Sequence, residues 1–131
     1  MALGEQDKAL AMLQTMINKR NDSRVSEEDK GLVMPFLHYI LAGMLRKIGK
    51  YKEALRACDD AVGIAREYNN LVRIPEMLFY MANCYHKLGE EEHIIRTHLV
   101  RAYHVAYSIG RNEIAALIKE KALEHHSIIV P

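Results

Sequence analysis

Apolar residues recur at steps of three and four along most of this chain of 131 residues, which is the spacing of an amphipathic helix. No hairpin dipeptide stands between segments of alternating apolar and polar residues, so the pattern predicts no strand. We therefore predict an all-α protein of about six helices. They are expected at 5–19, from just after Ser26 to 48, and at 51–68, 73–88, 91–109 and 112–125.

Glycine and proline mark the expected ends of these helices. Gly49, Gly89 and Gly110 each follow a periodic segment, and glycine most readily takes the left-handed conformation that ends a helix. Pro35 lies within the second periodic segment, where it either kinks the helix or begins its main part. The apolar tail SIIVP after the last helix is expected to pack back on the last helix pair.

The pattern that starts at Pro35 occurs twice. Pro35 and Pro75 are 40 residues apart, as are Gly49 and Gly89 (75 − 35 and 89 − 49), and a fixed period of this kind predicts stacked helix pairs. The second helix of the first pair carries small apolar residues at Ala54, Ala57, Cys58 and Ala61. Small side chains let two antiparallel helices approach closely, so these residues predict a tight contact within the pair.

This pattern resembles the tetratricopeptide repeat, whose two helices meet through small residues. The first copy matches at Leu41, Ala42, Gly49, Tyr51, Ala54, Leu55 and Ala61. In the second copy Ile94 and Arg101 replace the expected alanines, and Ala82 is expected to face the region of Ile94. The resemblance implies a right-handed superhelix of antiparallel helix pairs, in which the first helix of each pair lines a concave surface.

The same resemblance divides the chain, taken as one domain of residues 1–131, into repeats. A half-repeat at 4–20 is followed by repeats at 27–70 and 73–109 and by a C-terminal capping helix at 111–126. Because the first helix matches the second helix of a repeat, we expect the chain to be the C-terminal piece of a longer protein. The alternative is a natural short protein whose first helix pairs with another copy.

The whole chain also resembles the C-terminal helical region of bacterial Xre-type helix-turn-helix transcription regulators. The stretches that carry this resemblance are GKYKEALRACDDAVGIAREYNNL, PEMLFYMANCYHKLGE and AYHVAYSIGRNEIAALIKEKALEHHSIIVP. It implies a protein- or peptide-interaction and dimerisation module, the sensor part of a regulator, whose partners are a peptide or protein ligand and a second copy. The alternative is a scaffold or adaptor subunit of a protein complex, with no DNA or signal-peptide role.

Six side chains on the first helices of the pairs are expected to line the concave face and bind the ligand. They are Tyr39, Arg46, Lys47, Phe79, Asn83 and His86. The Asn83 amide can donate to and accept from a peptide backbone of any sequence, and Arg46 can bind a carboxylate. Tyr39 and Phe79 would supply apolar anchors. The alternative is an ordinary solvated helix face.

Charge, cysteine content and the lack of long apolar segments bear on the partners and the location of the protein. The 18 basic and 17 acidic residues are interspersed and give a formal net charge of +1, so we do not expect the clustered basic face that nucleic-acid binding needs. Cys58 and Cys84 lie in apolar helical segments and are expected to be buried, reduced thiols of a cytoplasmic protein. The sequence contains neither a signal-peptide pattern nor an apolar run long enough for a membrane span, so no membrane partner is expected.

Catalysis and metal binding are not expected either, and no cofactor is implied. The sequence contains no glycine-rich phosphate loop, no G-x-S-x-G motif and no H-E-x-x-H motif. The steps between His93, His98 and His104 are five and six, which do not put two rings on one helix face. His125 and His126 are expected at a frayed helix end. We therefore predict no enzyme activity, no catalytic residue and no metal site.

Overall fold

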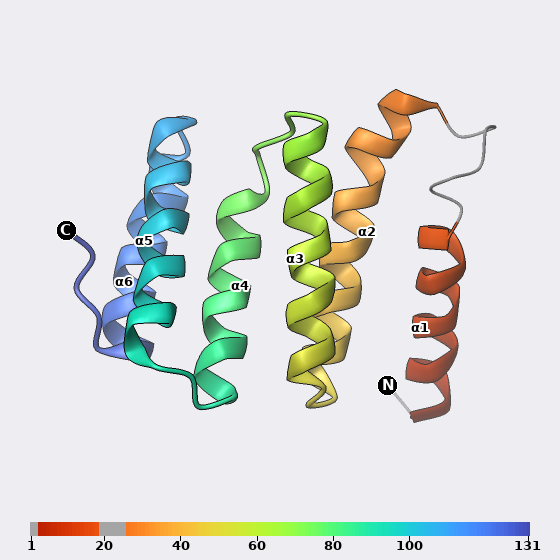
Figure 1. Ribbon diagram of the computed structural model, residues 1–131, viewed down its shortest axis with the longest axis horizontal. Helices are drawn as coiled ribbons and strands as arrows, with labels where there is room; N and C mark the ends of the chain where they lie inside the picture. Colours follow the sequence, from red (N-terminus) through yellow and green to blue (C-terminus); the bar gives the residue numbers. More distant parts are fainter. Residues whose placement is uncertain (1–2, 19–25) are drawn as a thin grey trace. The chain divides into compact units, whose positions relative to one another are not determined.

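The computed structural model describes residues 3–18 and 26–131, with side chains at 7–18, at 26 and from 33 onward (Figure 1). Its helices are α1 (Leu3–Asn18), α2 (Glu27–Lys47), α3 (Tyr51–Glu67), α4 (Ile74–Lys87), α5 (Glu92–Ser108) and α6 (Asn112–His126). The described residues contain no strand, so the prediction of an all-α protein with six helices is confirmed for them. Residues 19 and 20 of the predicted half-repeat lie outside this part of the chain.

The chain divides into two compact units, Met1–Asn70 with α1 to α3 and Leu71–Pro131 with α4 to α6. The boundary falls in the connection between the predicted repeats at 27–70 and 73–109. The superhelical stacking of the pairs, and with it the single domain over residues 1–131, stays a prediction. None of the described helices combines the length and the apolar content needed to cross a membrane.

In the unit Met1–Asn70, α2 and α3 form an antiparallel pair, and α1 contacts α2 (Figure 1). The small residues of α3 lie in the core as predicted, since Ala54, Cys58 and Ala61 are fully buried. Ala42 on α2 is 2% exposed. Among the described side chains of α1, only Leu13 is buried, so α1 adds less to this core than α2 and α3 do.

The second pair repeats the first with a shift of one residue in its second helix. α3 begins two residues after Gly49, whereas α5 begins three residues after Gly89. The buried positions Ala54, Cys58, Ala61 and Ala65 on α3 therefore correspond to Ile95, Leu99, Ala102 and Ala106 on α5. The prediction that Ile94 and Arg101 replace the alanines is wrong, because the extra residue rotates them away from the core. Ile94 is half-buried and Arg101 is exposed.

Glycines end α2, α4 and α5 as predicted. Gly49, Gly89 and Gly110 have φ values of 82°, 76° and 81°, in the region that side chains with a Cβ rarely adopt. The next N–H then turns back to the helix, as when the Lys50 N–H donates to the Leu45 carbonyl over 2.9 Å. Pro75 lies in the first turn of α4, whereas α2 continues through Pro35. α2 therefore does not begin at Pro35.

Candidate functional site

An open groove of about 370 Å³ lies in the unit Met1–Asn70, where all three helices contribute to its lining. The buried or half-buried side chains of its lining come from all three helices and are Ile17, His38, Leu41, Leu45 and Ala57. The exposed side chains of the lining are polar and are Gln14, Glu53, Arg56 and Asp60. The polar residues on α3 follow one another at steps of three and four, so they share one face of that helix. Apolar side chains beside charges of both signs suit a segment of polypeptide better than a small neutral molecule.

The three ligand residues predicted on α2 lie beside this groove and do not line it. Tyr39 and Arg46 are half-buried and Lys47 is exposed, whereas the groove uses His38, Leu41 and Leu45 of the same helix. None of these three groove residues was among the ligand residues predicted from the sequence. Ligand binding by Tyr39, Arg46 and Lys47 stays a prediction.

Two of the ligand residues predicted on α4 contact the end of α6. The Nε2 atom of His126 lies 2.8 Å from the Asn83 Oδ1 atom, and the ring donates because an amide oxygen can only accept. The rings of His86 and His126 meet edge to face with their centroids 4.8 Å apart. His125 and His126 end α6 as predicted, but His126 is held by α4 and is not frayed. α6 continues through His126, whose ring is half-buried against α4.

The surroundings of His126 favour its neutral form. Burial lowers the pKa of His126 below its ordinary value of 6.5, and the neighbouring His86 and His125 lower it further. Its Nδ1 atom is buried and has no hydrogen-bond partner among the described residues. A proton on that nitrogen would thus lack an acceptor, whereas the Nε2 proton has the Asn83 oxygen.

Phe79, the third ligand residue predicted on α4, packs at the edge of a buried apolar cluster. The cluster joins four elements of the unit Leu71–Pro131 and consists of Ala82, Ile95, Leu99, Ala122, Ile128 and Val130. Ile128 and Val130 belong to the tail, so the prediction that SIIVP packs back on the last helices is confirmed. Ala82 was expected to face the region of Ile94. It shares the cluster with Ile95, which is one residue further along the chain.

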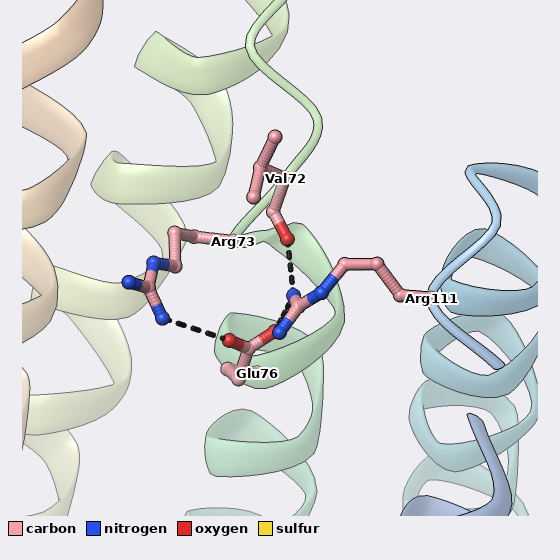
Figure 2. Close-up of polar contacts among 4 residues, drawn as sticks. All are labelled: Val72, Arg73, Glu76 and Arg111. Atoms are coloured by element: carbon pink, nitrogen blue, oxygen red, sulfur yellow. Dashed lines mark hydrogen bonds and ion pairs between the residues drawn. The ribbon is translucent and has the colours of Figure 1, made fainter. Parts of the chain in front are cut away.

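A polar network that the sequence did not predict connects the start of α4 with the start of α6 (Figure 2). Nη1 of Arg111 donates to the Val72 carbonyl and to the Glu76 carboxylate. The second carboxylate oxygen of Glu76 accepts from Arg73 over 3.2 Å. Both Arg111 and Glu76 are less than a quarter exposed, so this pair is partly protected from solvent. Partners 35 residues apart leave no local signal in the sequence.

No group of three His, Cys, Asp or Glu side chains in the described part of the chain is placed to hold a metal ion. Cys58 and Cys84 are buried and are not joined in a disulfide. The described residues thus define an all-helical protein of antiparallel pairs with an open groove of mixed polarity. Comparison with family models, with curated proteins and with solved structures found no match. The resemblance to the regulator family therefore rests on the residues quoted for it.

Proposed function

We propose that this chain is a protein- or peptide-interaction and dimerisation module, the C-terminal sensor part of a bacterial transcription regulator in the cytoplasm. The observation that carries the proposal is the repetition of one helix pair. α2–α3 and α4–α5 bury corresponding positions of their second helices, with alanine in both at Ala61/Ala102 and Ala65/Ala106, and begin those helices after a left-handed glycine. Repeated helix pairs present extended surfaces to polypeptides, which is their usual use.

The lining of the groove in the unit Met1–Asn70 indicates the chemistry of the ligand that we propose. Leu41 and Leu45 offer buried apolar surface, and Glu53, Arg56 and Asp60 offer charges at its edge. A ligand that fits is a peptide segment with apolar side chains between charged ones, because it can fill the floor and pair with the edge.

The test is a titration of peptide pools with the parent chain and with charge-reversal variants. We expect Arg56→Glu to weaken binding about tenfold, because it removes a charge from the groove edge. Lys52→Glu is the matched control, since Lys52 is exposed on the same helix and does not line the groove. Lys47→Glu tests the predicted concave face in the same way. Light scattering over a range of concentrations measures the mass, for which we expect a dimer.

Two results would count against the proposal. One is a chain that stays monomeric at all concentrations and binds no member of the pools. The other is binding that neither Arg56→Glu nor Lys47→Glu changes, which would place the ligand on a surface other than the two considered.

A further inference from the structure

The C-terminal tail occupies a surface built by helices α4, α5 and α6. Ile128 and Val130 are each 1% exposed and pack with Ala82, Ile95, Leu99 and Ala122, whereas Ile129 between them is 70% exposed. We call Ala82, Ile95, Leu99 and Ala122 the tail seat. An extended segment places alternate side chains on opposite sides, so the tail inserts its first and third aliphatic residues and leaves the second in solvent.

The tail is held by side chains and by one helix end. The last backbone hydrogen bond of the chain runs from the Ile128 N–H to the Ala122 carbonyl, and within the described residues none involves 129–131. Ser127, where the chain leaves α6, has a φ of 54°, which is strained for a residue with a Cβ. The segment beyond α6 thus has few backbone ties to break if another segment fills the tail seat.

The tail also lies beside the ligand residues predicted on α4. Phe79 packs against the same cluster, and Asn83, next to Ala82 in the chain, holds His126 immediately before the tail. A peptide bound at Phe79 and Asn83 would therefore lie close to the tail and to the end of α6.

We infer that the tail is an intramolecular occupant of a peptide site, and that the ligand of this site is an extended segment with two branched aliphatic residues separated by one residue. This inference rests on the proposed function and names the ligand chemistry for α4. The tail itself shows the complementarity, because the seat buries one isoleucine and one valine at that spacing. A ligand with the same spacing displaces the tail and makes the same contacts.

The experiment is a methyl NMR titration of the full chain with a synthetic peptide of the sequence SIIVP. On the parent chain, millimolar peptide should move the Ile128 and Val130 methyl signals to the positions of a free tail, while the signals of Leu13 and Val62 stay in place. In the variant Ile128→Ala/Val130→Ala the weakened tail should let the peptide bind at least about tenfold more tightly, since an attached competitor acts at millimolar effective concentration.

Two controls isolate the aliphatic contacts. Ile129→Ala should bind the peptide like the parent, because that side chain is mostly in solvent. A peptide with aspartate in place of the first isoleucine and the valine should not bind. The parent titration decides the matter alone if circular dichroism shows that the double variant has lost its helices.

The results for this inference are distinguishable from those for the proposed function. A pool peptide that binds without moving the Ile128 and Val130 signals overturns the inference and leaves the proposed function supported. An SIIVP peptide that moves neither those signals nor the Ile95 and Leu99 signals, at any concentration reached, also overturns it. Displacement of the tail by SIIVP but not by the aspartate peptide supports it.

Discussion

At the scale of single residues, alanine-sized side chains set how closely the helices of a pair approach. Ala54 is 0% exposed on α3, and Ala42 on α2 is 2% exposed. The sequence pattern predicted these buried positions, because small residues at steps of three and four have little purpose on a solvated face. In the second pair the predicted positions of the buried residues are wrong by one residue, because α5 begins three residues after Gly89, and not two.

Ala54→Leu tests this contact. The larger side chain has no free volume in a core that buries Ala54 fully, so we expect a loss of about 1–3 kcal/mol in the free energy of unfolding. Ala116→Leu is the control, because Ala116 is exposed within α6 and the same change there should stay within about 0.5 kcal/mol. Urea denaturation measures both variants. Equal stability of parent and Ala54→Leu would mean that the helices do not meet at this residue.

At the scale of elements, the unit Leu71–Pro131 joins its helices through both apolar and polar contacts. The tail closes the apolar side by burying Ile128 and Val130 among three helices. On the polar side, Arg111 connects the turn before α6 with the start of α4 through Val72 and Glu76 (Figure 2). α4 is thus held to the α5–α6 part of the unit by two kinds of contact.

Arg111→Met tests the polar connection while keeping most of the aliphatic length of the side chain. We expect it to lower the free energy of unfolding by about 1–2 kcal/mol, because it removes charge-assisted hydrogen bonds from a partly buried carboxylate. Arg96→Met is the matched control, since the pair of Arg96 and Glu92 is largely exposed and lies within α5. Its effect should stay below about 0.5 kcal/mol. Equal losses in both variants would contradict a special role for Arg111.

At the scale of the whole molecule, the chain contains two compact units, and a change of pH acts on each unit through the titratable groups that it contains. In the unit Leu71–Pro131, the pKa of His126 is displaced from its ordinary value. Burial and the neighbouring His86 and His125 lower that pKa, so the folded unit prefers the neutral ring. The unfolded chain then binds more protons than the folded unit between the lowered pKa and 6.5.

The free energy of unfolding of this unit should therefore fall as the pH falls through 6.5, and the fall should end below the pKa of the folded state. Urea denaturation at a series of pH values measures the slope. His126→Gln should flatten it, because glutamine can still donate to Asn83 but does not titrate. His104→Gln, at an exposed position on α5, should keep the parent slope. A His126→Gln variant with the parent slope would show that His126 does not cause it.

The helices were predictable because their signals are local. Each described end lies within two residues of its expected position, since apolar periodicity, Gly49, Gly89 and Gly110 act over a few neighbouring residues. The candidate site was less predictable. The pattern placed Asn83 and Phe79 on one face of α4, but it did not predict that His126 and the tail lie there, because those partners are 43 or more residues further along the chain.

The sequence by itself determined that the chain forms helices, where they end and which small residues are buried, because these features follow from the helical period and from backbone conformations of single residues. The tertiary structure alone decided the groove lined by Arg56, the Arg111 network, the one-residue shift of α5 and the seat of the tail. These depend on which side chains meet after the helices have packed, and contacts between distant segments leave no periodic trace in the sequence.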